Sequence, residues 1–136
     1  MTRRRISSGG PWEAVAGYSR AIVVDDDCWV AGTTDAGADG RSAHPGDVAA
    51  QARAALAIIE AALADAGFSL ADVVRTRMFV TDISRWEEYG RAHGEFFRDV
   101  RPAATMVEVI RLIDPAMMVE IEVDARTSPR AGSDRA

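Results

Sequence analysis

The sequence contains no lysine, because all 16 of its basic residues are arginine. Without a lysine amine, the chain cannot form a Schiff base with a carbonyl substrate or with pyridoxal phosphate. Its single cysteine, Cys28, permits no disulfide within the chain, and its 2 histidines, His44 and His93, are far apart in sequence. Two distant histidines without cysteine partners make no recognisable metal site. We therefore expect neither a metal ion nor a cofactor.

Long apolar runs are also absent. No segment approaches the roughly 18 consecutive apolar residues of a membrane-spanning helix, so we expect no membrane partner. The start "MTRRRISSGGPW" is basic, but the apolar stretch of a secretory signal does not follow it. An unpaired cysteine fits a reducing compartment, and we expect a cytoplasmic protein. The net charge of −5 argues against a nucleic-acid partner, because duplex binding depends on many phosphate contacts.

A length of 136 residues indicates one domain. We place this domain at residues 12–125. Arginine runs lie at both ends of the chain. The sequence predicts a flexible N-terminal arm over residues 1–11 and a flexible C-terminal tail over residues 126–136.

Within the domain, hydrophobic periodicity predicts strands and two helices. Strands are expected at 18–24 and 28–34, joined by an acidic turn at 25–27, then at 73–82, 104–112 and 117–125. The first helix, 47–66, should end at Gly67. The second, 85–98, should begin with a capping box formed by Ser84 and Glu87. This order predicts an α+β fold, with two helices packed on one face of a mixed sheet.

The second helix carries an aromatic stripe on the face expected to pack against the sheet. Its members are Trp86, Tyr89, His93, Phe96, Phe97 and Val100. A histidine within such a stripe is typical of a packed, hydrogen-bonded side chain, and we expect this for His93. Cys28 is likewise expected to be a small buried residue.

The last strand, "MMVEIEV", alternates apolar and acidic residues. Successive side chains of a strand point to opposite faces. If the helices cover the apolar face, Glu120 and Glu122 lie side by side on the other one. That face is either solvated, or it holds a partly buried carboxylate whose pKa is raised by burial and by its neighbour. A carboxylate of the second kind can transfer protons near neutral pH.

Several segments together resemble the Rid/YjgF family, the reactive intermediate deaminases, also called endoribonuclease L-PSP-like proteins. They are "GYSRAIVVDDDCWVAGTT", "DVAAQARAALAIIEAALADAG", "VVRTRMFVTDI", "RPAATMVEV" and "VEIEVDA". The resemblance implies a chorismate-mutase-like fold and a homotrimer with small-molecule pockets between subunits. It also implies the hydrolysis of enamines or imines to a ketone and ammonia.

The resemblance assigns site residues by position. Glu120 matches the family glutamate that holds or activates the attacking water. Tyr18 and Gly32 match a pocket tyrosine and a strand-end glycine beside the ligand. Thr105 and Met106 match positions in the pocket wall, although many members have a cysteine at the second of these.

One position departs from the pattern. In "RPAATMVEV" the fourth residue is Ala104, whereas deaminases of the family carry an arginine there that binds the substrate carboxylate. Alanine cannot replace a bidentate guanidinium. The chain therefore resembles the subgroups of the family that lack this arginine.

The sequence thus predicts a trimeric enzyme that uses Glu120 and water to hydrolyse an imine, an enamine or a related labile nitrogen compound other than 2-aminoacrylate. Two alternatives remain open. One is a small-molecule-binding or regulatory trimer without turnover, and the other is an endoribonuclease.

Overall fold

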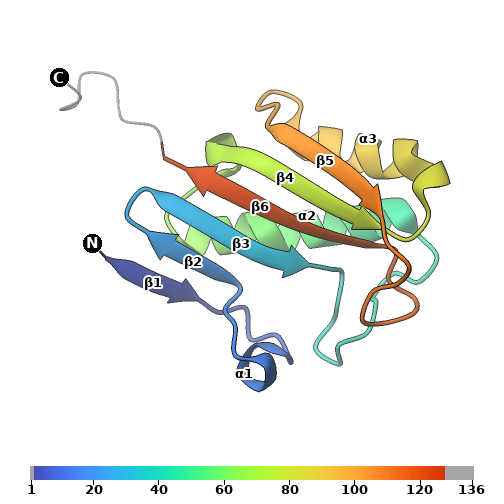
Figure 1. Cartoon of the computed structure of the whole chain (residues 1–136), viewed down its shortest axis with the longest axis horizontal. Helices are drawn as coiled ribbons and strands as arrows, with labels where there is room; N and C mark the ends of the chain where they lie inside the picture. Colours follow the sequence, from blue (N-terminus) through green and yellow to red (C-terminus); the bar gives the residue numbers. More distant parts are fainter. Residues whose placement is uncertain (1, 128–136) are drawn as a thin grey trace.

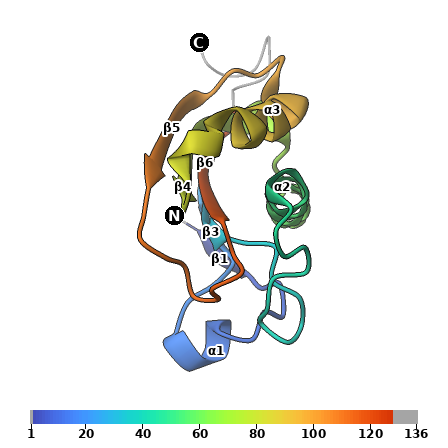
Figure 2. The ribbon, with the colours of Figure 1, turned by 90° about the vertical axis from the view of Figure 1, so that its right-hand side faces the viewer.

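The computed structural model describes residues 2–127. Within this range, two long helices cover one face of a six-stranded sheet with the strand order β1-β2-β3-β6-β4-β5 (Figures 1 and 2). Strands β4 and β5 are parallel, and the other neighbours are antiparallel. This confirms the α+β fold with two helices on one face of a mixed sheet. The elements are β1 (Arg3–Ile6), α1 (Glu13–Ala16), β2 (Ala21–Val24), β3 (Asp27–Thr33), α2 (Val48–Asp65), η1 (Leu70–Asp72), β4 (Val73–Val80), η2 (Ile83–Arg85), α3 (Trp86–Phe97), β5 (Ala103–Glu108) and β6 (Val119–Arg126).

Strand β6 lies in the middle of the sheet and separates two environments. Val119, Ile121 and Val123 are fully buried beneath the helices. The residues between them are partly exposed on the face that none of the helices within residues 2–127 covers. The alternation seen in the sequence therefore corresponds to one core face and one open, acidic face, as expected for a sheet with helices on a single side.

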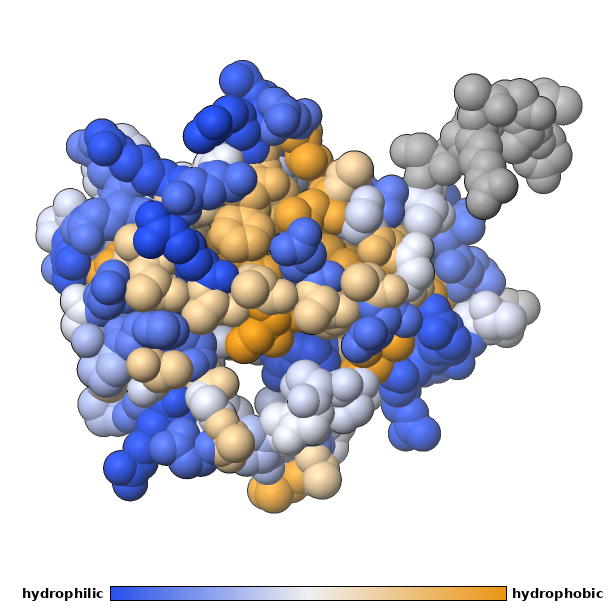
Figure 3. Space-filling view, turned by 180° about the vertical axis from the view of Figure 1, so that it is seen from behind, coloured by the Kyte–Doolittle hydropathy of each residue, from blue (hydrophilic) through white to orange (hydrophobic). Residues whose placement is uncertain are grey.

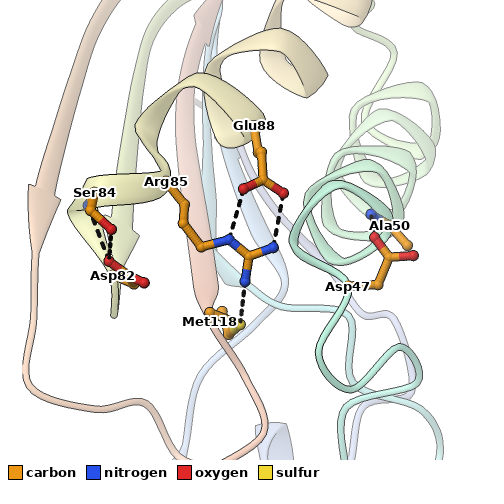
Figure 4. A network of polar contacts seen from close by, with 7 residues as sticks. All are labelled: Asp47, Ala50, Asp82, Ser84, Arg85, Glu88 and Met118. Atoms are coloured by element: carbon orange, nitrogen blue, oxygen red, sulfur yellow. Dashed lines mark hydrogen bonds and ion pairs between the residues drawn. The ribbon is translucent and has the colours of Figure 1, made fainter.

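Helix α2 is defined by clear signals at both ends. The Asp47 side chain accepts a hydrogen bond from the Ala50 amide at 3.0 Å (Figure 4). At the other end, Gly67 adopts a φ of +84°, and the Phe68 amide donates to the Leu63 carbonyl at 2.8 Å. This pattern is a Schellman motif, and it confirms that the helix ends at the predicted glycine.

Helix α3 begins differently from the prediction. Asp82 accepts hydrogen bonds from both the amide and the hydroxyl of Ser84, and the chain forms the short turn η2 before α3 (Figure 4). Glu87 instead pairs with Arg91. The predicted capping box is therefore wrong, because an upstream carboxylate competes for the serine hydroxyl that would have closed it.

The aromatic stripe of α3 is only partly buried. Tyr89 and Phe97 are in the core, but Trp86 is 57% exposed, so its expected packing is wrong. Trp86 is the first residue of α3, so the buried part of the stripe begins one turn later, at Tyr89. His93 lies 2.9 Å from the Thr76 hydroxyl through Nε2 and packs on the Phe97 ring. This confirms a packed, hydrogen-bonded histidine.

The N-terminal segment is ordered where a flexible arm was expected. Residues Arg3–Ile6 form β1, which pairs antiparallel with β2. Arg4 also donates a 2.7 Å hydrogen bond to the Ala66 carbonyl at the end of α2. Ile6 is buried at the edge of the core, and its burial stabilises this strand. The arginines beside it made the segment look too polar to pack against the domain. At the other end, Arg126 still belongs to β6, and the rest of the expected tail, from residue 128, lies outside the described residues.

The helix-covered side of the molecule carries an apolar band between charged regions (Figure 3). Helix α2 presents exposed alanines on its outer side, among them Ala57, Ala61 and Ala64. Among the described helices, none combines the length and the apolar character required to cross a membrane.

Gln51 on α2 gives a test of this architecture. It is fully buried and donates to the carbonyls of His44 and Ala116 at 3.1 and 2.9 Å, while its oxygen accepts from the Met118 amide at 2.7 Å. We expect Gln51→Leu to lower the free energy of unfolding by about 1–3 kcal/mol or more, because these buried backbone groups lose their partners. Urea denaturation measures the change. Glu60→Ala, on the exposed side of the same helix, is the control, and an equal effect of both changes would contradict this role.

Candidate functional site

A cavity of about 880 Å³ opens beside the N-terminal half of the sheet. Its walls come from residues 6–12, the end of β3 and the C-terminal turns of α2. One residue of β6, Glu120, also lines it. Segments from both ends of the chain therefore enclose it. Tyr18 and Gly32 also line this cavity, so the structure brings three of the site residues expected from the sequence into one place.

Gly32 and Glu120 are in close contact. A Cβ atom at position 32 would lie 2.9 Å from Cδ of Glu120 and closer still to Oε2. Beside this glycine, the pairing of β3 with β6 is irregular between Val30 and Thr33. A bulge of this kind brings one backbone close to a side chain of the next strand. Only glycine leaves the Glu120 carboxylate in this position.

The electrostatic environment separates Glu120 from the other acids of β6. Arg77 on β4 pairs with Glu122 at 3.2 Å and with Asp124 at 3.4 Å. Glu120 has no ion pair within residues 2–127. Burial raises the pKa of the Glu120 carboxyl, Arg20 opposes this shift, and Glu122 adds to it. Glu120 is therefore the carboxylate of this face that is best suited to exchanging protons near neutral pH.

Arg20 is a site residue that the sequence did not single out. It is 7% exposed and lines the cavity. Its Nη1 donates to the Gly32 carbonyl and the Thr33 hydroxyl, each at 2.7 Å. Its Cζ lies 5.6 Å from the centre of the Tyr18 ring. The signal was present in the spacing, since residues two apart on an extended segment share a side, and Tyr18 was already a candidate.

Within the described residues, no group of three or more His, Cys, Asp or Glu side chains could hold a metal ion. His44 contributes its backbone amide to Asp35, and His93 is occupied by Thr76. Burial raises the pKa of the Cys28 thiol to about 11, so this residue remains a protonated core side chain.

Comparison with known proteins identifies the family. A family model described as "Endoribonuclease L-PSP" matches residues 10–127. The chain belongs to this family. It is 37% identical to an uncharacterized protein from Streptomyces coelicolor, over 90% of each chain. It is 34% identical to a RutC family protein from Sulfurisphaera tokodaii, over 80% of this chain and 86% of the relative.

Solved structures agree with this assignment. Rv2704 from Mycobacterium tuberculosis, a member of the YjgF/YER057c/UK114 family, is 50% identical with a TM-score of 0.84, over 93% of this chain and 100% of that one. The YjgF gene product of E. coli is 28% identical with a TM-score of 0.79, over 92% of this chain and 99% of that one. The chain is thus a Rid/YjgF protein in both sequence and fold.

Three expected site residues of this Rid/YjgF chain lie elsewhere in the monomer. Ala104, Thr105 and Met106 are on β5, the edge strand (Figure 1). Strand β4 lies between β5 and β6, which places β5 about 10 Å from the strand of Glu120. Ala104 also pairs with Thr76, whereas Glu120 pairs with Phe79, three residues further along β4. One chain therefore does not bring these residues to the cavity.

The raised pKa of Glu120 makes the free energy of unfolding of this Rid/YjgF chain depend on pH. A carboxyl whose pKa is higher in the folded state than in the unfolded state loses stabilisation as the pH rises through the folded pKa. We therefore expect Glu120→Gln to gain stability relative to the wild type as the pH increases above 4.5, the ordinary pKa of a glutamate side chain. Urea denaturation between pH 4 and 8 measures the difference. Glu122→Gln, which loses the Arg77 pair, should show no such gain, and a difference for Glu120→Gln that does not change with pH would contradict the prediction.

Proposed function

We propose that this protein is a trimeric enzyme of the Rid type that hydrolyses an imine, an enamine or a related labile nitrogen compound in the cytoplasm. The observation that carries the proposal is the position of Glu120. Its carboxyl lies against Gly32 in a cavity, without an ion pair in the described chain, and its pKa is raised by burial. Membership of the family supports the same type of chemistry.

The proposed reaction needs one group that can both accept and donate a proton. The Glu120 carboxylate accepts a proton from water while the water oxygen attacks the imine carbon. The protonated carboxyl then donates this proton to the nitrogen, which gives a carbinolamine. In a second transfer the Glu120 carboxylate accepts the proton of the new hydroxyl and donates it to the amine nitrogen, so that the carbon–oxygen double bond forms, the carbon–nitrogen bond breaks and ammonia leaves. With an enamine, the protonated carboxyl first donates its proton to carbon, which produces the protonated imine and leaves Glu120 as the carboxylate that accepts the proton of the attacking water. A raised pKa favours both directions of transfer near neutral pH.

Ala104 argues for a substrate other than 2-aminoacrylate. The small side chain offers no donor for a carboxylate bound at β5. A substrate held in this cavity must therefore carry no such group, or must place it elsewhere.

We propose self-association because the chain exposes surfaces that suit an interface between subunits. Within residues 2–127, no segment covers the sheet face opposite the helices, and β5 is an edge strand (Figure 2). Val107 on β5 and Ile110 just after it are 43% and 95% exposed. We propose that β5 of a neighbouring copy supplies Thr105 and Met106 to the wall of a cleft between subunits.

The assembly can be tested directly. Light scattering of the purified protein in dilute buffer should give about three times the chain mass of 14.6 kDa. Burial of the open sheet face and of the exposed apolar side chains provides the driving force. A stable monomer at micromolar concentration would contradict the trimer.

The catalytic role of Glu120 can be tested with a matched pair of variants. We expect Glu120→Gln to lower ammonia release from a panel of imines about 10²- to 10⁴-fold, because it removes the general acid–base group. Glu122→Gln should remain within about fivefold of the wild type, since it removes a partly exposed ion pair. Light scattering of both variants checks that assembly is intact. Equal losses in the two variants would show that Glu120 is not the reacting group.

The same assays decide between this proposal and its alternatives. Ligand binding without ammonia release from any member of the panel would favour a regulatory trimer. Salt-sensitive RNA cleavage that is lost in Glu120→Gln would favour the endoribonuclease activity named in the family description. The exposed arginines of β1, Arg3 to Arg5, directly precede the cavity loop in the sequence and are candidates for contact with RNA in that case.

A further inference from the structure

Arg20 is a buried cation without an acidic partner. The residue is 7% exposed, yet among residues 2–127 no carboxylate lies within ion-pair distance of its guanidinium. Buried charges in proteins are normally paired with an opposite charge. The uncharged acceptors around Nη1 satisfy part of its hydrogen-bonding capacity, but they do not neutralise the positive charge.

The two edges of the guanidinium are used differently. Nη1 is committed to the Gly32 carbonyl and the Thr33 hydroxyl. Nη2 has only a long contact of 3.4 Å with the Tyr18 hydroxyl, and Nε is enclosed without any hydrogen-bond partner. The N–H groups of Nε and Nη2 point in the same direction and form the edge that receives a carboxylate in a bidentate contact. Nη2 therefore has unused donor capacity beside Tyr18, whereas Nε is unpaired but enclosed by the protein.

The cavity wall indicates what else the ligand carries. Trp12, Ile58 and Ile113 line it together with several alanines and glycines. The volume of about 880 Å³ is far larger than an acid of two or three carbons requires, and it suits a ligand with a ring or a branched chain. One arginine balances a single negative charge, whereas a doubly charged phosphate would leave one charge uncompensated.

We infer that Arg20 is the anion-binding group of this cavity and that its ligand is a monocarboxylate with an apolar body. The carboxylate accepts hydrogen bonds from Arg20 and from the Tyr18 hydroxyl, and the apolar body packs against Trp12 and Ile58. The inference rests on the proposed function in placing the reacting carbon beside Glu120. It assigns to Arg20, which directly precedes β2, the role that Ala104 on β5 cannot fill.

Two unreactive probes of equal shape separate charge from packing. Calorimetric titration of the full chain compares phenylacetate with its neutral counterpart phenylacetamide. The wild type should prefer the acid. Arg20→Gln should weaken the binding of phenylacetate about 10- to 100-fold, as expected for the loss of a charge-assisted hydrogen bond, and should leave the binding of the amide unchanged. Arg20→Lys, which keeps the charge without the planar fork, should restore part of the preference.

The controls distinguish the possible failures. Arg91→Gln, at an 83% exposed side chain on α3, should change neither affinity. A wild type that does not prefer the acid, a wild type that binds inorganic phosphate more tightly than phenylacetate, or an equal loss of acid and amide in Arg20→Gln would each overturn the inference. Glu120→Gln should still bind phenylacetate. A wild type that prefers the acid but hydrolyses no imine would overturn the proposed function and leave the anion site standing.

Discussion

The contact between Gly32 and Glu120 is the constraint on which the site depends. Two charged side chains meet this glycine from different directions, since Glu120 occupies the space of a missing Cβ and Arg20 binds the carbonyl. The irregular pairing of β3 with β6 makes room for both. A larger residue at position 32 would displace the carboxylate, and a regular strand would turn the carbonyl into the sheet ladder, away from Arg20.

Much of this arrangement follows from local patterns in the sequence. The alternation along β6 predicted one buried and one acidic face, because strand periodicity is a property of the backbone itself. Gly67 predicted the end of α2, because few other residues adopt a positive φ readily. The pocket positions of Tyr18, Gly32 and Glu120 followed from the family resemblance, and the structure places these three around one cavity.

The parts that sequence reasoning missed are those decided by competition between distant or neighbouring groups. Ser84 could form a capping box, but the nearer carboxylate of Asp82 takes its hydroxyl. An arginine-rich N-terminus suggested an arm, but pairing with β2 makes it an edge strand. Arg20 was not singled out, because the Gly32 carbonyl and the Thr33 hydroxyl that accept its hydrogen bonds lie on β3 and become its neighbours only on folding.

Glu120 and Arg20 line the same cavity without forming an ion pair within residues 2–127. Burying an isolated charge costs free energy, and this applies to both Glu120 and Arg20. A direct ion pair between these two side chains would be the simplest way to reduce that cost. Such a pair would also lower the pKa of Glu120 and remove its capacity to act as a base near neutral pH. By holding the two groups on either side of Gly32, beyond ion-pair distance, the fold keeps the carboxyl weakly acidic and the guanidinium unpaired. If Arg20 binds an anion as inferred above, a ligand that supplies the missing negative charge recovers part of this cost.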